Sequence, residues 1–403
     1  MEIKLSKTIK ITTLFFLMVF TSNAADLVVR DGGAGGAYAT ITSAIAAASD
    51  GDRIIIRPKS SNLPYIESVS VNKSLTFVTE IHGVRYAVLG NFNIEAAAGR
   101  IVTVHDLELE GTNNVTMSSD VTGNDRMQIN ILNSRVNNGF GDINFQKNSV
   151  TVNVVGCSFR SLRMVHGKAI ANDCEKIIVG PDNGTVLAND DIYIIANKIF
   201  TSDLNVDPVE IFQPQYAFHV LNNYIKSLSG SNYVLITSAK ENTTNFINNN
   251  YVEGTTSQRI RIDGSGTGTG THNIVINNNI LSAIDVNNSD AFVVATYNVT
   301  TNTAFSFSSV DIQSNNTTNV NFTTSPTADI LAVGDNINAG DPNSIYTDID
   351  LTRNDIGRAG GSFSWNNYWP LQDQQPYVFF LNTPRIIFNG ITTFDANGSG
   401  TTN

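Results

Sequence analysis

The stretch Leu221-Asn222-Asn223-Tyr224-Ile225 decides the fold, because it returns along the chain with little change. Each copy begins with an apolar residue, has an asparagine at its centre and ends in an apolar or aromatic residue. The other copies are Ile195-Ala196-Asn197-Lys198-Ile199, Ile247-Asn248-Asn249-Asn250-Tyr251 and Ile276-Asn277-Asn278-Asn279-Ile280, with Val155-Gly156-Cys157-Ser158-Phe159 as a variant. The central residues Asn197, Asn223, Asn249 and Asn278 are separated by 26, 26 and 29 residues. A repeat of this length is typical of a solenoid.

Between Arg53 and about Thr324 the sequence consists of short runs rich in Val, Ile, Phe and Tyr, most of them followed by Gly, Asn or Ser. The repeated phrase keeps one orientation, which favours parallel stacking, since antiparallel strands would need a hairpin turn at each reversal. Three short strands fit one repeat, and successive turns would lie about 4.8 Å apart. The sequence therefore predicts an all-β fold, a single-stranded parallel β-helix.

The asparagines of the phrase are expected to be structural. Asparagine tolerates a left-handed backbone at a sharp bend, and stacked amides on successive turns can hydrogen-bond to one another and to the turn backbone. Cys157 fills the same slot, which favours a small buried residue there; a disulfide with Cys174 is the alternative in an oxidising compartment. These residues mark the fold and not an active site.

The first residues are typical of an export signal. Lysines precede the apolar run from Ile11 to Phe20, and Ser22 and Ala24 fit a small-residue cleavage site. This run and all later ones are too short for a transmembrane segment. We therefore predict a signal peptide over residues 1–24, a β-helix with its N-terminal cap over 25–324 and a C-terminal cap over 325–403.

Both ends of a stack need covering, because an open turn exposes strand edges and apolar core. At the N-terminal end, Ile41, Ile45 and Ala48 would share one face of a short capping helix over residues 39–48. From about Ser325 onward the repeat is lost, and we expect an irregular C-terminal cap.

The chain has a net charge of −11 and a pI near 4.9, so it has no general attraction for nucleic acid. An anionic ligand would need local arginines or a bridging cation. We expect a monomer without a nucleic-acid partner.

The segment from Tyr38 to Pro58 resembles the entry to right-handed parallel β-helix proteins of the pectin-lyase-like superfamily, and the asparagine phrases continue the resemblance to about residue 280. The tail from Asn338 to Gly357 resembles a C-terminal signature of secreted bacterial β-helix proteins. The resemblance implies a right-handed helix, an extracellular or cell-surface location and a polysaccharide or glycan partner, acidic in character. The fold hosts lyases, hydrolases, esterases and adhesins, so it does not name a reaction.

Phe218 to Ile225 is similar to a stretch of pectate lyases, in which an arginine pair flanking a proline lies just upstream and supplies the catalytic base. The segment from Val209 to Tyr216 contains Pro214 but no arginine. The paired aspartates and the Gly-His-Gly motif of polygalacturonases are also missing. The sequence therefore leaves two functions open: binding and cleavage of a polysaccharide as a lyase or glycoside hydrolase, or a non-catalytic adhesin or cell-surface structural protein.

One charged group is a candidate substrate site: Arg259, Arg261, Asp263, Glu210 and Lys240. If the isoleucines between the arginines point inward, the two-residue period of a strand sends both arginines and Asp263 outward. Such arginines could bind a uronic or sulfated sugar and, in a lyase, abstract a proton α to a carboxylate. The alternative is a solubilising surface.

Asp348, Asp350 and Asp355 place three carboxylates in one stretch, which makes calcium the candidate cofactor. The alternative is a set of salt bridges to Arg353.

The aromatic cluster Trp365, Tyr368 and Trp369 is expected to close the core of the cap, with sugar stacking as the alternative. His219 lies within a strand phrase, where ordinary packing is expected.

Overall fold

The computed structural model describes residues 24–121, 126–181, 191–202, 206–228, 232–253, 259–264, 272–287, 289–300, 304–318, 322–324, 330–332, 336–369, 378–382 and 397–400. The predicted signal peptide lies outside these residues, apart from Ala24. No helix among the described residues is long and apolar enough to span a membrane.

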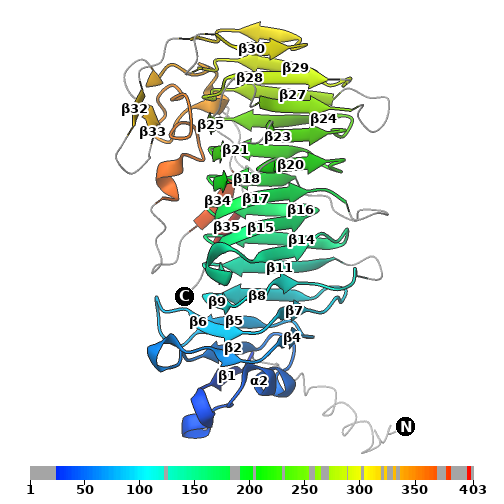
Figure 1. Ribbon diagram of the computed structural model, residues 1–403, viewed down its shortest axis with the longest axis vertical. Coiled ribbons are helices and arrows are strands. Elements are labelled where there is room, and N and C mark those ends of the chain that lie inside the picture. The colour runs from blue at the N-terminus through cyan, green and yellow to red at the C-terminus, as the bar shows by residue number, and fades with distance from the viewer. Residues whose placement is uncertain are drawn as a thin grey trace, which may run out of the picture.

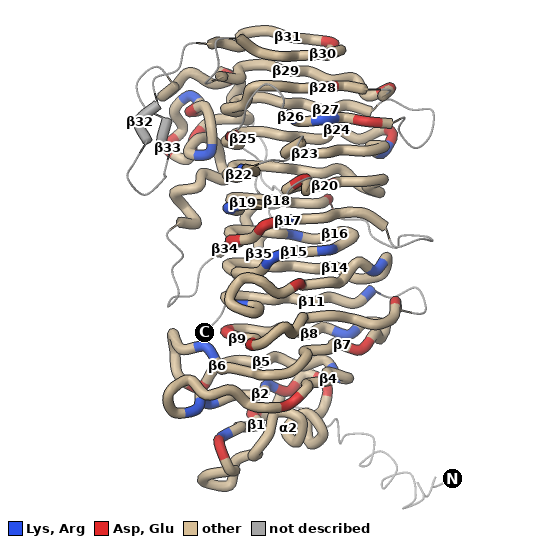
Figure 2. The backbone as a smooth tube through the Cα atoms, viewed as in Figure 1, with Lys and Arg blue, Asp and Glu red and all other residues tan. Residues whose placement is uncertain are grey.

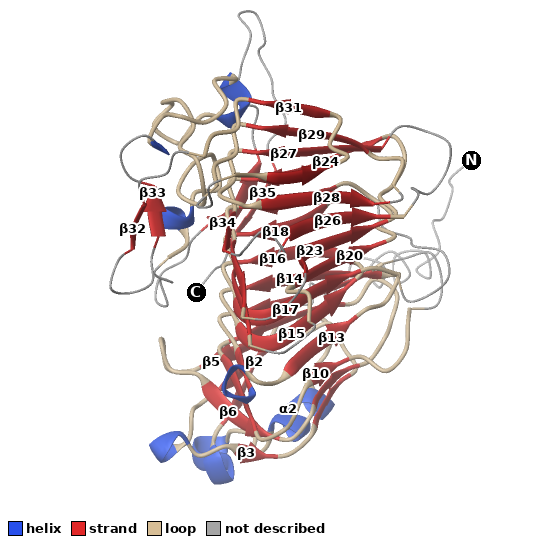
Figure 3. Cartoon of the chain, turned by 45° about the horizontal axis from the view of Figure 1, so that its top comes forward, coloured by secondary structure: helices blue, strands red, loops and turns tan. Residues whose placement is uncertain are grey.

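The described strands form an elongated stack of parallel strands (Figures 1 and 3). A first row of strands is a 13-stranded parallel sheet in the described part of the chain. It contains β1 (Asp26–Val29), β2 (Arg53–Ile56), β5 (Thr76–Thr79), β8 (Ile101–His105), β11 (Met127–Leu132), β14 (Val150–Val155), β16 (His166–Ile170), β18 (Ile192–Ile195), β21 (Phe218–Leu221), β24 (Thr243–Asn248), β27 (His272–Asn277), β29 (Phe292–Thr296) and β31 (Ile312–Ser314).

The second sheet has 18 described strands in two rows, which β15 (Ser158–Met164) and β17 (Asp173–Val179) join because each runs through both. The second row contains β3 (Tyr65–Ile66), β6 (Tyr86–Leu89), β9 (Leu107–Glu110), β12 (Arg135–Val136), β19 (Lys198–Thr201), β22 (Tyr224–Ser227) and β25 (Tyr251–Glu253). The third row contains β4 (Val69–Val71), β7 (Phe92–Ile94), β10 (Val115–Thr116), β13 (Asp142–Phe145), β20 (Val209–Phe212), β23 (Asn232–Thr237), β26 (Arg259–Asp263), β28 (Ala283–Asn287) and β30 (Ser306–Ser308).

The three rows enclose one continuous apolar core. Alternate residues of each strand point inward, as in β26, where Ile260 and Ile262 are buried between partly exposed charged residues. The inward side chains of all three rows belong to the same buried cluster. This arrangement confirms the predicted parallel β-helix.

The corner between the first and second rows is a bend of two residues. The first, at the bend position, has a positive φ: 53° at Ala196, 57° at Asn222 and Asn249, and 56° at Asn278. The second, at the ladder position, points inward and stacks on its equivalents in neighbouring turns. Asparagine suits the bend position because it tolerates the left-handed region.

Ladder asparagines bond from turn to turn. The backbone N–H and the Nδ2 of Asn197 both donate to Oδ1 of Asn223, at 2.8 and 3.0 Å, and Nδ2 also donates to the carbonyl of Ala169 at 2.8 Å. The same pattern links the ladder residues Asn172, Asn197, Asn223, Asn250, Asn279, Asn298 and Asn316. The sequence predicts that the central asparagine of each phrase both takes the left-handed bend and bonds to the next turn. In the structure two neighbouring residues divide these roles. Asn249 and Asn278 are bend residues, and the residues that follow them form the ladder.

Cys157 occupies the ladder position at the N-terminal end of this series. Its N–H donates to Oδ1 of Asn172 at 2.9 Å, and its thiol and that of Cys174 are both free and buried. Burial raises the pKa of the Cys157 thiol to about 12, so it behaves as a small core residue.

The helix α2 (Ile41–Ala47) lies beside β1, β2 and β4 at the N-terminal end of the stack (Figure 3). Thr40 caps it by accepting a hydrogen bond from the N–H of Ser43 at 3.1 Å. Ile41, Ile45 and Ala48 are all buried, as the sequence predicts. The 3-10 helices η1 (Asp31–Gly36) and η2 (Ser60–Asn62) belong to the first turns, and η3 (Asn137–Gly139) lies beside β9, β12 and β15.

Residues 336–369, which we call the strap, run along the side of the stack next to the corner of β21, β24 and β27 (Figure 1). The strap contains η5 (Ser344–Tyr346) and η6 (Trp365–Asn367). Two antiparallel pairs also lie in the C-terminal region, β32 (Phe322–Thr324) with β33 (Ile330–Ala332) and β34 (Val378–Asn382) with β35 (Asn397–Gly400). The strap therefore covers a corner of the stack and not its last turn.

Candidate functional site

The predicted charged group lies mainly on the third row. Arg259, Arg261 and Asp263 alternate along β26 with buried residues, and Glu210 is likewise outward on β20. Lys240 lies in the turn before β24, where its carbonyl accepts a hydrogen bond from Thr243. The structure thus brings the two arginines and Asp263 together, while β23 lies between β26 and Glu210.

These charges are already paired within the protein. Nη2 of Arg261 lies 2.9 Å from Oδ2 of Asp263, and Nε of Arg259 lies 3.3 Å from Oδ2 of Asp285. Glu210 accepts a hydrogen bond from Nζ of Lys176 at 2.7 Å. Sequence reasoning missed Asp285 and Lys176 as partners, although the register of the third row places Asp285 directly beside Arg261. The surface is electrically balanced, in keeping with the mixed charges along the stack in Figure 2.

The three aspartates of the strap do not form a calcium site. Among the described residues, no group of three or more His, Cys, Asp or Glu side chains could hold a metal ion. Backbone amides occupy the carboxylates instead: Asp348 accepts from Asp355 and Gly361, Asp350 from Thr352, and Asp355 from Asn338. These bonds give the three carboxylates a structural role in the loop.

Arg353 does not provide the alternative salt bridges. Its Nε donates to the carbonyl of Gly340 at 2.6 Å, its Nη2 donates to that of Ala339 at 3.1 Å, and its guanidinium lies over the ring of Tyr297. The acidic stretch is therefore a network of backbone caps.

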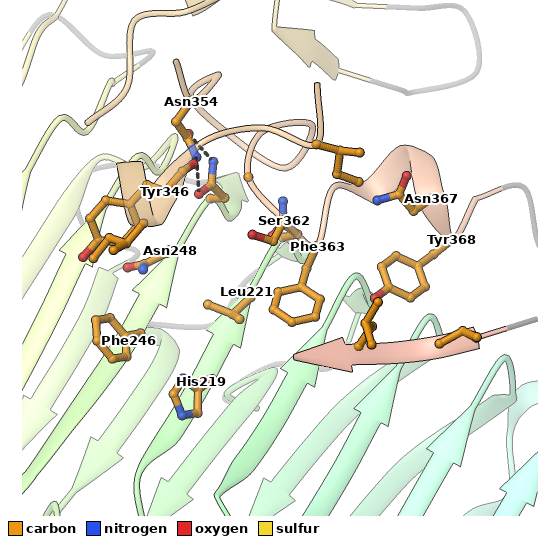
Figure 4. A pocket seen from close by; sticks show the side chains of 17 residues that line it. His219, Leu221, Phe246, Asn248, Tyr346, Asn354, Ser362, Phe363, Asn367 and Tyr368 are labelled. Carbon is orange, nitrogen blue, oxygen red and sulfur yellow. Dashed lines mark hydrogen bonds between the residues drawn. The ribbon is translucent and has the colours of Figure 1, made fainter. Parts of the chain in front are cut away.

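A concave site lies between the first row and the strap. It is a cavity of about 600 Å³, which we call the strap pocket (Figure 4). Its aromatic lining consists of His219, Phe246, Tyr346, Phe363 and Tyr368, and its amide lining of Asn222, Asn248, Asn249, Asn354 and Asn367. It has the volume and mixed lining of a small-ligand site.

The floor of the strap pocket is part of a column of rings on the first row. Tyr193, His219 and Phe246 occupy the same register position on β18, β21 and β24. The rings of Tyr193 and His219 stack at 4.6 Å, and those of His219 and Phe246 at 5.5 Å. Nε2 of His219 lies 3.0 Å from Oδ2 of Asp191, which fixes the plane of the imidazole. The parallel register thus builds a column of rings whose faces are turned toward one another.

Bend asparagines hold the strap that forms the opposite wall. Nδ2 of Asn222 donates to the carbonyls of Arg358 and Gly360 at 2.9 and 2.6 Å, and Nδ2 of Asn249 donates to that of Asp355 at 2.8 Å. Oδ1 of Asn278 accepts from the N–H of Asp341 at 2.6 Å. These amides point outward because the bend position faces away from the core.

Glycine is required where the strap folds most closely. A Cβ at Gly360 would lie 1.9 Å from the carbonyl oxygen of Asp355 and 2.7 Å from Nδ2 of Asn249. A larger residue there would separate the strap from the corner.

The aromatic cluster of the strap divides between core and pocket. Trp365 is buried in a second apolar cluster that covers the corner, and it stacks on Trp369 at 5.1 Å. Nε1 of Trp369 donates to the carbonyl of the bend residue Ala196 at 2.7 Å. Tyr368 instead lines the strap pocket. Core closure thus describes Trp365, while Tyr368 packs against the same cluster and also lines the pocket.

Sequence reasoning missed most of the strap pocket. His219 and Phe246 carried a usable signal, because both occupy the outward position two residues before the end of their strands. Tyr346 and Phe363 carried none, since their place depends on how the strap folds back.

A scan against protein-family models finds no match to this chain, and a search of curated proteins finds no relative. The fold and the geometry of the site are therefore the basis for assigning a function.

Proposed function

We propose that this protein is a secreted glycan-binding β-helix protein that holds its ligand in the strap pocket. The observation that carries the proposal is the stack of His219 on Phe246 on one wall of the pocket, with Tyr346 and Tyr368 from the strap on the other. Sugar rings have apolar C–H faces that pack on aromatic rings, and hydroxyl edges that hydrogen-bond to amides. Asn367, an exposed amide of the lining, supplies such a group.

The charge of the lining favours a neutral sugar in this pocket. Among the described residues that line it there is no lysine, arginine, aspartate or glutamate. An acidic polymer would therefore have to bind through neutral residues or elsewhere on the molecule.

Secretion and the pectin-lyase-like family are parts of the same proposal. The export-signal pattern in residues 1–24 and the phrase resemblances support them. N-terminal sequencing of protein recovered from the medium of a bacterial culture tests secretion. We expect a mature chain that begins near Ala25. Protein that stays inside the cell with residues 1–24 still attached would contradict secretion.

A glycan array followed by calorimetric titration tests ligand binding. Phe246→Ala and Tyr368→Ala should each weaken the binding of the titrated glycan by about tenfold, because each removes an aromatic ring from the lining of the pocket. Phe292→Ala is the matched control: it removes an exposed phenylalanine of the first row outside the pocket. Unchanged affinity in both pocket variants, or binding of apolar probes without any glycan, would refute the proposal.

Cleavage of an acidic polymer is a second candidate, and one observation on the third row favours it. Nε of Arg261 makes no hydrogen bond among the described residues, so this guanidinium keeps an N–H donor that no described protein acceptor uses. Incubation with uronate polymers should then give the absorbance of a new double bond, lost in Arg261→Gln and kept in Phe246→Ala. No absorbance change over a broad panel of polymers would rule out lyase activity.

A further inference from the structure

The first turns of the stack differ from the later ones at the corner between the first and second rows. Residues 57–64 connect β2 to β3 and residues 80–85 connect β5 to β6, where later turns have two-residue bends. These loops and β9 border a second, open cavity of about 530 Å³, which we call the loop pocket. Ser61 and Asn62, in the first loop, both have a positive φ, so the loop keeps a shape that local sterics disfavour.

The loop pocket is locally cationic. Its lining has three cationic residues, Arg57, Lys59 and Arg85, and one anionic residue, Glu108. In a chain with a net charge of −11, this gathering of positive charge runs against the overall balance. A partly enclosed basic cavity attracts anions because its low-dielectric walls strengthen the local field.

The cations differ in how firmly the protein holds them. Nε and Nη2 of Arg85 donate to the backbone oxygen and to Oδ1 of Asn133, at 2.8 and 2.6 Å, which fixes the guanidinium. Nζ of Lys59 lies 3.1 Å from the exposed carboxylate of Asp31. Nη1 of Arg57 lies 3.8 Å from Glu80, a carboxylate that already binds Arg30 in a bidentate pair. Arg57, half-exposed and loosely paired, is thus the most available of the three.

Glu108 lies beneath the loops. It is outward on β9, yet only 9% of the residue is exposed, and its nearest ionic partner is Nε of Arg135 at 3.9 Å. Burial raises the pKa of its carboxyl, and the nearby charges of Arg135 and Arg85 lower it. A carboxyl group in this place can accept a hydrogen bond from a ligand hydroxyl.

We propose that the loop pocket binds a tetrahedral oxyanion, a sulfate or phosphate ester carried by a hydroxylated molecule. Its cations come from two loops and so approach an ion from several sides, which suits acceptors pointing in several directions. Arg85 itself cannot grip a planar carboxylate bidentately through Nε and Nη2, because both atoms are bonded to Asn133. The hydroxyls of Ser60 and Ser61 line the same cavity and add neutral donors.

Calorimetric titration of the whole protein with six probes tests this proposal: inorganic sulfate, inorganic phosphate, a glucose sulfate, a glucose phosphate, glucuronate and unmodified glucose. One or both esters should bind more tightly than the free ions, and unmodified glucose should not bind here. The ester that binds more tightly shows whether the pocket prefers a sulfate or a phosphate group. Arg57→Gln and Lys59→Gln should each weaken ester binding by about tenfold, the effect of one charge-assisted hydrogen bond.

Arg53→Gln is the control, since Arg53 lies on the same turn but pairs with Asp26 outside the pocket. It should leave ester binding unchanged, and so should Phe246→Ala in the strap pocket, which separates this proposal from glycan binding there. Unchanged melting temperatures would show that the variants are folded. The proposal is overturned if no ester shows saturable binding, if Arg57→Gln and Lys59→Gln both bind the ester as tightly as wild type, or if glucuronate binds as tightly as the esters.

Discussion

At the scale of single residues, the corner of each turn divides its work between two neighbours. The bend residue takes a positive φ, which costs an alanine such as Ala196 about 1 kcal/mol, and the ladder residue bonds inward. Asn222 and Asn223 look alike in the sequence, yet the first binds the strap and the second binds the next turn. The sequence could not separate them, because asparagine suits both positions for different reasons.

Asp348 makes the strap sensitive to pH. Burial raises its pKa from 3.8 to about 6, with the charge of Asp355 adding to the rise and the amide of Gly361 opposing it. The folded protein therefore keeps a proton that the unfolded chain releases. This contribution to the free energy of unfolding is complete below about pH 4 and is lost as the pH rises through about 6.

We expect the deprotonation of Asp348 to lower the melting temperature of the wild type as the pH rises from about 4 to about 7. Asp348→Asn should remove that part of the slope, because the amide keeps an acceptor oxygen without titrating. Differential scanning calorimetry of both proteins across this range gives the comparison. Parallel pH profiles for wild type and variant would show that Asp348 does not titrate as described.

At the scale of elements, the strands could be predicted and the strap could not. Short β-rich runs with a period of two specify strands such as β26 from local sequence alone, and the repeat specifies their parallel order. The course of the strap depends on contacts about 105 to 138 residues away in the chain, between Asn249 or Asn222 and the strap. The same distance explains why most of the strap pocket was missed.

The bend asparagines are expected to keep the strap docked. Asn249→Gly retains the positive φ without strain and removes three donor contacts, to Asn354, Asp355 and Gly357. Hydrogen exchange in residues 336–369 should become faster by about tenfold or more, while the strands of the first row keep their protection. Ser309→Gly, at another positive φ of 55°, is the control. Equal protection of the strap in both variants would mean that its docking does not depend on Asn249.

At the scale of the whole molecule, the ladder adds side-chain hydrogen bonds to the strand pairing between each turn and the next. Side-chain bonds run without a break from Asn172 to Asn316, in parallel with the strand pairing of the three rows. In a stack with nearest-neighbour coupling, the free energy of unfolding is close to a sum over turns and their interfaces. A defect in the middle of the ladder therefore weakens the contact between two long halves, and a defect at its end affects one turn.

Asn223→Ala is the mid-ladder defect. It leaves the buried N–H of Asn197 without its acceptor at 2.8 Å and removes the bond from Nδ2 to the carbonyl of Ile194. Unsatisfied buried groups of this kind cost about 1–3 kcal/mol each, so we expect a loss of about 2–5 kcal/mol and a broader urea transition by circular dichroism. Asn316→Ala, at the end of the ladder, should cost less and leave the transition as sharp as in the wild type. If the two variants lose the same stability with equally sharp transitions, the ladder does not couple the halves of the stack.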